Sequence, residues 1–276
     1  MKNSLRILAL AIATLLIAAA FAGCGAKKAE EGTTLRVGME CAYAPFNWTQ
    51  NDNSNGAVPI EGGGFAGGYD VEMAKKIADG LGRELVIVKT EWDGLEPAVS
   101  SGKIDAIIAG MSNNPDRATR VDFTDNYYTS NIVVVVKKEG PYAEAKSIHD
   151  FVGAKITGQL STLHYDFIDQ MEGVEKQAAM EDFPTMVVAV SSGKIDGYTT
   201  ELPGARSAVA TNPDLMYIEF AEGNGFDVDI DEVSVAVALR KGSDLRDPIN
   251  EILKGIGEDE RNTLMDEAVK NQPSAE

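Results

Sequence analysis

The eight residues Ala-Val-Ser-Ser-Gly-Lys-Ile-Asp occur twice in the chain, as Ala98–Asp105 and as Ala189–Asp196. Each copy follows a stretch of helical character and continues into a strand-like run, Ile104–Gly110 in the first case and Ile195–Glu201 in the second. Two copies that start 91 residues apart do not make the tandem array of a solenoid. They instead predict two related lobes, and a cleft between lobes is a common binding place for a small molecule.

The patterns around the first copy alternate between strand and helix. A strand is expected over Thr34–Gly38, and apolar residues at helical spacing predict a helix over Val71–Leu81. A strand over Leu85–Val88, a helix over Leu95–Val99 and a strand over Ile104–Ala109 follow. This order predicts a parallel sheet with helices on both faces. The stretch Asn47–Gly68 is rich in Asn, Gly and Asp and is expected to be a loop or an insertion.

A second series of elements surrounds the second copy. Four consecutive valines within Asn131–Lys137 predict a buried strand. The later elements are expected to be strands over Lys155–Thr157, Glu175–Ala178, Ile195–Thr200 and Val233–Leu239, and helices over Thr162–Gln170, Pro184–Val190, Asp247–Ile256 and Glu258–Asn271. We therefore expect lobe 1 to hold residues 34–130 and 233–272, and lobe 2 to hold residues 131–232. The chain would cross twice, near Ser130 and near Val233, and two crossings make a hinge.

The N-terminus has the pattern of a targeting segment. Lys2 and Arg6 precede the apolar run Ile7–Ala22, which is typical of an export signal. Residues 1–23 are therefore expected to be a signal peptide. The end of this segment, Phe21-Ala-Gly-Cys24, resembles the lipobox of bacterial lipoproteins, with Phe in place of the usual Leu.

This resemblance implies that Cys24 is lipidated, with palmitate among its acyl chains, and that residues 24–33 form a polar tether. The protein would then be held on the extracytoplasmic face of the cell membrane without spanning it. The alternative is an ordinary signal peptide followed by an unmodified cysteine.

The charge and the cysteine content exclude several classes of partner and site. Beyond residue 23 the chain has 43 acidic and 23 basic side chains, a formal net charge of −20, which repels nucleic acid and anionic headgroups. Cys41 is the only other cysteine, so no internal disulfide is expected. A buried thiol is the favoured role for Cys41, because the two histidines, His149 and His164, are far away in sequence. Neither a cofactor nor a metal site is expected, since the glycines of 62–68 follow a polar loop and no metal-ligand pattern is present.

The residues from Ile107 to Arg117 have the features of a carboxylate receptor. A buried strand ends at Gly110, which permits close backbone approach, and Ser112 offers a hydroxyl group. Asn114 and Pro115 are typical of the N-cap and first turn of a short helix. Backbone N–H groups at a helix start attract an anion, and the planar fork of Arg117 fits a carboxylate. The alternative for Arg117 is a surface ion pair.

The second copy supplies a group of opposite charge. Its strand ends at Glu201, and a carboxylate at that end would face the crevice and bind an ammonium group, unless Glu201 is simply exposed. Tyr43 and Trp92 follow the first and second strands and could form walls beside an aliphatic or cationic side chain, with Trp48 a less certain third.

Five segments together resemble the polar amino-acid binding proteins of ABC importers. They are Leu35–Phe46, Gly68–Ala74, Trp92–Leu95, Ser101–Gly110 and Val121–Tyr128, and the likeness extends from about Leu35 to Asp266. The resemblance implies an α/β, two-lobed, type II periplasmic-binding-protein-like fold, with two parallel or mixed sheets, helices on both faces and two hinge strands. It also implies a monomeric receptor that closes on a free amino acid and delivers it to an ABC permease with its ATPase.

The resemblance also assigns roles to residues. Arg117 would bind the α-carboxylate of the ligand, Glu201 its α-amino group, and Glu40 its side chain, between the aromatic rings of Tyr43 and Trp92. The full set of expected ligand contacts is Glu40, Tyr43, Trp92, Gly110, Met111, Ser112, Arg117, Gln159, Thr162 and Glu201. The chain departs from the family pattern at Ser161, which replaces a glycine before Thr162.

The acidic Glu40 and the two aromatic rings favour a basic amino acid, with glutamine or cystine as alternatives. An enzyme on the same scaffold, similar to the cyclohexadienyl dehydratases or to a domain of lytic transglycosylases, is the alternative from another class. We do not expect an enzyme, since no histidine lies in a predicted cleft motif. A sensor domain fused to a kinase is also not expected, because the chain ends at Glu276.

Overall fold

The computed structural model describes residues 33–273, and the predictions for the signal peptide and for Cys24 lie outside this range. Within it, residues from Leu35 onward form one compact unit. Two five-stranded sheets and one smaller sheet make up its β-structure. The part of the chain described contains no helix that is long and apolar enough to cross a membrane.

The first sheet has the strand order β6-β1-β7-β14-β8. Its strands are β1 (Thr34–Met39), β6 (Glu84–Lys89), β7 (Ala106–Ile107), β8 (Val121–Tyr128) and β14 (Val235–Arg240). The helices of this region are α2 (Tyr69–Leu81), α3 (Leu95–Ser100), α4 (Pro115–Ala118), α9 (Arg246–Lys254) and α10 (Glu258–Asn271). α2 has buried apolar residues at the predicted spacing and ends at Gly82, which adopts the left-handed conformation that suits a helix C-terminus.

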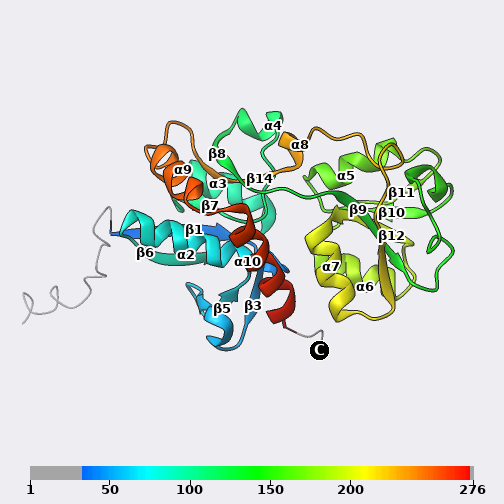
Figure 1. Ribbon diagram of the computed structural model, residues 1–276, viewed down its shortest axis with the longest axis horizontal. Helices are drawn as coiled ribbons and strands as arrows, with labels where there is room; N and C mark the ends of the chain where they lie inside the picture. The colour runs from blue at the N-terminus through cyan, green and yellow to red at the C-terminus, as the bar shows by residue number, and fades with distance from the viewer. Residues whose placement is uncertain (1–32, 274–276) are drawn as a thin grey trace, which may run out of the picture. The chain divides into compact units, whose positions relative to one another are not determined.

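The second sheet has the strand order β11-β10-β12-β9-β13. Its strands are β9 (Ile132–Lys137), β10 (Lys155–Thr157), β11 (Glu175–Lys176), β12 (Gly197–Glu201) and β13 (Leu215–Ile218). The helices around it are α5 (Leu163–Phe167), α6 (Phe183–Ser191) and α7 (Leu202–Thr211), and they are seen beside β12 and β9 in Figure 1. The 3-10 helix η4 (Ile168–Gln170) continues α5.

The two copies of the repeat adopt the same local structure. Asp105 exchanges two hydrogen bonds with the backbone of Arg36 in β1, and Asp196 exchanges the same two with the backbone of Lys155 in β10. Each copy leads into a strand, β7 or β12, that pairs in parallel with one neighbour and antiparallel with the other. The repeated sequence therefore fixes equivalent strands at equivalent positions in the two sheets.

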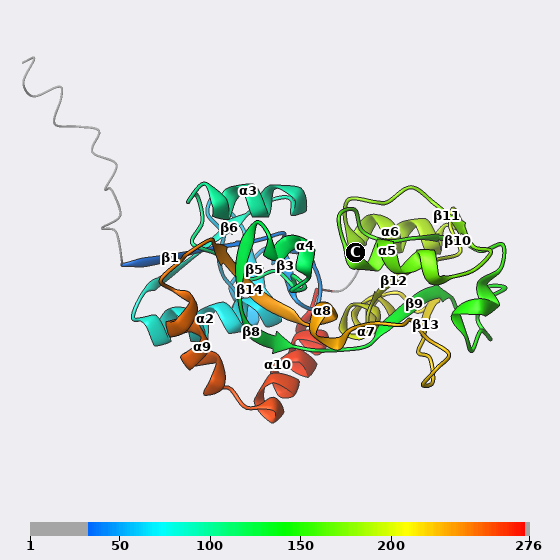
Figure 2. The ribbon, with the colours of Figure 1, turned by 90° about the horizontal axis from the view of Figure 1, so that it is seen from above.

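Two chain segments connect the sheets, as Figures 1 and 2 both show. One runs from β8 into β9, and the other returns through α8 (Ile230–Val233) into β14. The hydroxyl groups of Thr129 and Ser234 lie 2.7 Å apart and join the two connections. The predicted crossings near Ser130 and Val233 fall on these segments.

The prediction of a loop over Asn47–Gly68 is wrong. This stretch forms β3 (Asn47–Gln50), β4 (Val58–Pro59) and β5 (Phe65–Gly67), which join β2 (Ala42–Tyr43) in a third sheet. The 3-10 helix η1 (Ser54–Gly56) lies among them. These strands are too short and too rich in glycine to show a strand pattern in the sequence.

Other boundaries also differ from the sequence-based expectations. Val233 ends α8 and does not begin β14, whose first five residues are all buried and do not alternate. The strand predicted over Ile104–Ala109 has ladder pairing only at Ala106 and Ile107. β8, α7 and β13 were not predicted as elements. β8 alternates buried and partly exposed positions only imperfectly, since Asp122, Asp125 and Asn126 interrupt its apolar residues.

Candidate functional site

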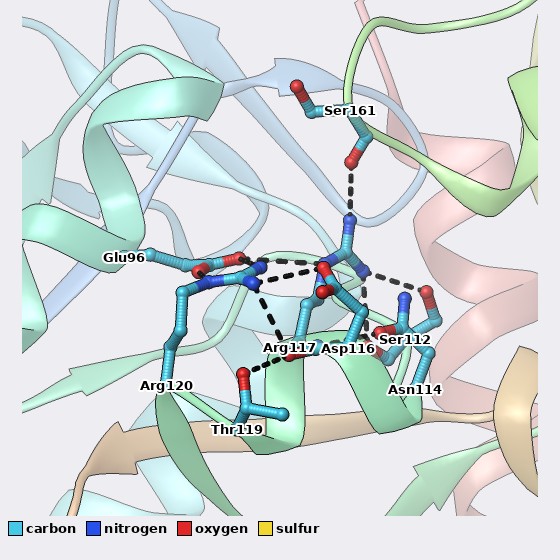
Figure 3. Close-up of polar contacts among 8 residues, drawn as sticks. All are labelled: Glu96, Ser112, Asn114, Asp116, Arg117, Thr119, Arg120 and Ser161. Atoms are coloured by element: carbon cyan, nitrogen blue, oxygen red, sulfur yellow. Dashed lines mark hydrogen bonds and ion pairs between the residues drawn. The ribbon is translucent and has the colours of Figure 1, made fainter.

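The side chain of Arg117 is buried between elements of the two sheets (Figure 3). Asn114 caps α4 by accepting a hydrogen bond from the Arg117 backbone N–H at 2.8 Å, as its sequence position predicts. The Arg117 Nη1 donates to the hydroxyl of Ser112 at 2.8 Å and to its carbonyl oxygen at 3.1 Å. The Nη2 donates to the carbonyl oxygen of Ser161 at 2.8 Å. Arg117 therefore connects the end of β7 with the segment that precedes α5.

The environment of Arg117 leaves much of its charge uncompensated. Its Nε lies 3.7 Å from the Glu96 carboxylate, which also pairs with the exposed Arg120 at 2.7 Å. Burial lowers the pKa of Arg117 to about 10, and the charge of Glu96 opposes this only in part. The guanidinium carbon also lies 5.1 Å from the ring centroid of Trp92, a cation–π distance. A buried cation of this kind favours an anionic partner such as a carboxylate.

Ser161 adopts a backbone conformation typical of glycine, the residue that the family resemblance predicts at this position. Its φ angle is +58°, in the left-handed region that glycine adopts most easily. The carbonyl oxygen of Ser161 accepts a hydrogen bond from Arg117. The next residue, Thr162, is buried and donates to the carbonyl oxygen of Gln159 at 2.7 Å.

A second polar contact joins Glu40, which follows β1, with Gln159, which follows β10. The Gln159 amide nitrogen lies 3.2 and 3.3 Å from the two oxygens of the Glu40 carboxylate. Both side chains are buried. Burial raises the pKa of Glu40 to about 7, with smaller contributions from Asp182 and Glu91, while Gln159 opposes the shift. Glu40 can thus be either a neutral acceptor or an anion near neutral pH.

Tyr43 packs between Gly110, which follows β7, and Gly204 of α7. A Cβ atom at Gly110 would be 3.0 Å from the Tyr43 ring, and a Cβ at Gly204 of α7 would be 3.2 Å from it. The ring stacks on Phe183 of α6 with centroids 4.0 Å apart. Burial raises the pKa of Tyr43 well above its usual range, and the charge of Glu201 adds to the effect. Tyr43 is therefore packed against elements of both sheets.

A buried hydrogen-bond network supports the strand ends of the first sheet. Asp70 accepts from Tyr127 Oη at 2.7 Å and from the Asn47 amide at 2.8 Å. Tyr127 Oη in turn accepts from the Gly110 backbone N–H at 3.1 Å, and Asn47 accepts from the Cys41 N–H at 2.7 Å. The network fixes the backbone beside Glu40 and at Gly110. Cys41 is a buried free thiol, as predicted.

Glu201 is buried at the end of β12 and is not an exposed side chain. His164 Nε2 lies 2.7 Å from its Oε2, and Thr200 Oγ1 lies 3.4 Å from the same oxygen. Burial favours the neutral acid, but His164 and Tyr43 outweigh it and lower the pKa of Glu201. The predicted cleft motifs contain no histidine, but the structure places His164 against Glu201, the last residue of one of them. His164 was missed because its link to Glu201 joins α5 to β12, which are 37 positions apart in the sequence.

The structure thus connects most of the predicted residues. Arg117 contacts Trp92 and Ser112, Gln159 contacts Glu40, and Tyr43 packs on Gly110. Met111 is buried, and its backbone accepts from Ala236. Trp48 belongs to the third sheet, where its indole donates to Gln50 at 2.8 Å. Sequence reasoning did not single out His164, Phe183 and Glu96.

Two cavities border the predicted site. One of about 420 Å³ is lined in part by Trp92, Met111 and Ser161. The other, of about 440 Å³, is lined in part by Arg117, Ser161 and Thr162. Among residues 33–273 there is no group of three or more His, Cys, Asp or Glu side chains that could hold a metal ion.

Comparison with known proteins gives consistent relatives in sequence and in structure. The probable histidine-binding protein of Campylobacter jejuni is 32% identical over 239 residues, which cover 86% of this chain and 84% of that protein. The L-cystine-binding protein TcyJ of Escherichia coli is 29% identical, over 84% of this chain and 80% of that protein.

Solved structures extend the comparison. The amino acid ABC transporter substrate-binding protein AbpA of Streptococcus pneumoniae, bound to L-arginine, superposes with a TM-score of 0.72 at 26% identity, over 86% of this chain and 95% of that chain. An ancestral arginine-binding protein bound to glutamine gives a TM-score of 0.70 at 28% identity, over 85% and 97% of the two chains. The α/β fold is therefore the type II periplasmic-binding-protein-like fold that the sequence predicted.

The model of the bacterial extracellular solute-binding proteins, family 3, matches residues 35–268, nearly all of the compact unit that carries the two sheets. With the relatives above, this match shows that the chain belongs to the bacterial extracellular solute-binding proteins of family 3.

Proposed function

We propose that this protein binds a free polar amino acid between its two sheets and delivers it to an ABC import permease. The observation that supports this most directly is a pair of buried side chains of opposite charge, one on a helix that follows a strand of the first sheet and one on a strand of the second. Arg117 follows β7, and Glu201 ends β12. The carboxylate of a zwitterion would bind Arg117 and its ammonium would bind Glu201, so that one ligand contacts both.

Hinge closure is the proposed mode of capture. Lobe 1 would comprise residues 34–130 and 233–272, and lobe 2 residues 131–232, with the connections at Thr129 and Ser234 as the hinge. The Arg117–Ser161 hydrogen bond and the Tyr43–Phe183 stack support this proposal, because each joins elements of the two proposed lobes. A ligand shifts the equilibrium toward closure only because it contacts both lobes.

For the ligand we propose a basic amino acid. Glu40 can supply a negative charge for a cationic side chain, and Trp92 and Tyr43 supply aromatic faces. The arginine-bound relative supports this choice. Glutamine and cystine are the competing ligands, because relatives bind them as well and because Gln159 can exchange hydrogen bonds with an amide.

We also propose that the mature protein acts as a lipid-anchored monomer outside the cytoplasm. The family name places its members outside the cell, and Cys24 would carry the anchor. A binding role is favoured over an enzymatic one, because the relatives are binding proteins.

The most direct test identifies the small molecule that copurifies with the protein. Native mass spectrometry should detect one amino acid per chain, and calorimetry on refolded protein should rank arginine, lysine, ornithine and histidine above glutamine and cystine. Glutamine or cystine binding alone would exclude the basic ligand but retain the receptor. Turnover of prephenate by the pure protein, with no amino acid bound, would contradict the receptor itself.

A further inference from the structure

His164, whose side chain is 14% exposed, is the partner of a buried carboxylate that the proposed ligand also needs. Its Nε2 lies 2.7 Å from Glu201 Oε2, while its Nδ1 is buried without a hydrogen-bond partner among the described residues. The ring edge faces Phe183, with centroids 6.4 Å apart, and the backbone is held by Thr199, whose Oγ1 donates to the His164 carbonyl at 2.6 Å. These contacts place the imidazole beside Glu201.

We propose that His164 competes with the α-ammonium group of the amino acid for Glu201, so that a charged imidazole weakens ligand binding. This inference rests on the proposed function. A charged imidazole and an ammonium group both donate to a carboxylate, and both neutralise the same negative charge. Two cations beside one buried carboxylate repel each other, so the ligand is expected to bind best when His164 is neutral.

The sign of the pH effect follows from this competition. Histidine is the side chain that ordinarily changes charge between about pH 5 and pH 8. If its proton must leave before the ligand binds, binding is coupled to proton release and becomes weaker as the pH falls. The receptor would then bind tightly at neutral pH and release its ligand in an acidic medium.

The other groups around the pair do not supply this effect in the same way. Tyr43 faces Glu201 from β2, and its raised pKa keeps it neutral throughout this range. Asp70 of α2 interacts electrostatically with Glu201, and its pKa is raised to about 7 by burial. α6 carries no titratable side chain. The remaining neighbouring elements carry several charged residues. Arg206 of α7 pairs with Asp266, and Asp169 of η4 pairs with Lys176. The others are Asp166 of α5 and, at the ends of β9 and β10, Lys137 and Lys155.

Glu40 and Asp70 can also change charge near pH 7, so the test must separate them from His164. The chain offers a matched control, because it contains only one other histidine, His149. His149 is exposed on the 3-10 helix η3 (Ile148–Phe151), and Glu40 and Asp70 are unchanged in all of the variants compared.

The experiment measures arginine affinity by calorimetry at pH 5.5 and pH 7.5 for the wild type, H164Q and H149Q. We expect His164 to weaken arginine binding at the lower pH, by about tenfold for each pH unit over which one proton leaves per ligand bound. H164Q should lose that contribution, whereas H149Q should behave as the wild type. H164N, with a shorter neutral amide, should agree with H164Q, and thermal melting verifies that each variant is folded.

Three outcomes are informative. A pH ratio in H164Q equal to that of the wild type would overturn the competition, while arginine binding itself would keep the proposed function. An H164Q affinity that is lower than wild type to the same extent at both pH values would make His164 a positioning residue for Glu201, which also overturns it. No amino acid binding by the wild type at pH 7.5 would contradict the proposed function instead.

Discussion

At the scale of single residues, the candidate site contains ionisable groups whose charged forms are destabilised by burial. Arg117 is only 3% exposed, and its hydrogen bonds go to Ser112 and Ser161, which carry no charge. Glu96 lies 3.7 Å away and shares its charge with Arg120. A buried guanidinium whose counter-ion is shared with a second arginine favours a further anionic partner.

The substitution R117A should therefore weaken amino acid binding strongly. Truncating one partner of a buried charge pair costs roughly 2–5 kcal/mol, which is a loss of at least thirtyfold in affinity. R120A is the matched control, because Arg120 shares the Glu96 carboxylate but its side chain is 47% exposed; it should cost about 1 kcal/mol or less. Calorimetry that finds less than a threefold loss for R117A would reject the carboxylate role.

Glu40 should make the stability of the protein depend on pH. Its pKa is raised from 4.5 to about 7, so the folded state favours the protonated acid. The stabilisation that this pKa shift contributes to the folded state is fully present below pH 4.5 and is lost as the pH rises through about 7. From pH 5 to pH 8 the free energy of unfolding should fall, with up to about 3 kcal/mol of the change due to Glu40.

Urea denaturation at pH 5, 6.5 and 8 measures this effect. E40Q should flatten the fall, although Asp70, whose pKa is also raised to about 7, should maintain part of it. E91Q changes an exposed neighbouring carboxyl group and should follow the wild type. If the free energy of unfolding changes with pH equally in E40Q and in the wild type, the pKa of Glu40 is not raised in the folded state.

At the scale of elements, strand ends and helix starts place the functional groups. β1 ends before Glu40, β7 leads to Gly110, and β12 ends at Glu201. The short α4 carries Arg117 and is capped by Asn114. The two repeats set these strands in equivalent positions, and the residues that follow them differ: one continues to a guanidinium and the other ends in a carboxylate.

Gly110 is an element boundary with little tolerance for a side chain. Its φ angle is +60°, and a Cβ atom would lie 3.0 Å from the Tyr43 ring. G110A should lower the free energy of unfolding by about 2–3 kcal/mol, because the left-handed conformation alone costs about 1–2 kcal/mol for a residue with a Cβ. G193A is the control: its φ angle is +75° but no atom lies within 4 Å of the added Cβ. Equal denaturation midpoints for the two variants would show that the Tyr43 ring can move away from the added Cβ with no loss of stability.

At the scale of the whole molecule, ligand binding and domain closure should be one process. Contacts from elements of one sheet to elements of the other include Arg117–Ser161, Gln159–Glu40 and Tyr43–Phe183. None of these three contacts involves the connecting segments at Thr129 and Ser234. If the proposed hinge opens at these connections, the hydrogen bond between the two hydroxyl groups can be kept.

Addition of the bound amino acid should make the protein more compact. Small-angle X-ray scattering of the protein stripped of ligand should show a decrease in the radius of gyration when ligand is added. R117A should require far more ligand for the same decrease, because closure is driven only by differential binding to the two states. A radius that does not change on saturation would show that the lobes do not open in solution.

The sequence by itself determined the repeated structural unit and pointed to many residues of the candidate site. The repeat, the helical spacing over Val71–Leu81 and the valines of β9 predicted the alternating elements, because these are local patterns set by burial and backbone preference. The cap-and-proline pattern at Asn114 correctly placed the start of α4. Resemblance to a family then added the ligand roles, which local patterns cannot provide.

Only the tertiary structure decided which groups face one another. It showed that Asn47–Gly68 completes a third sheet, that Ser161 adopts the conformation of glycine, and that Gln159 contacts Glu40. It also placed His164 beside Glu201. These features depend on contacts between positions far apart in the chain, whose energies arise from packing and charge and not from the local sequence.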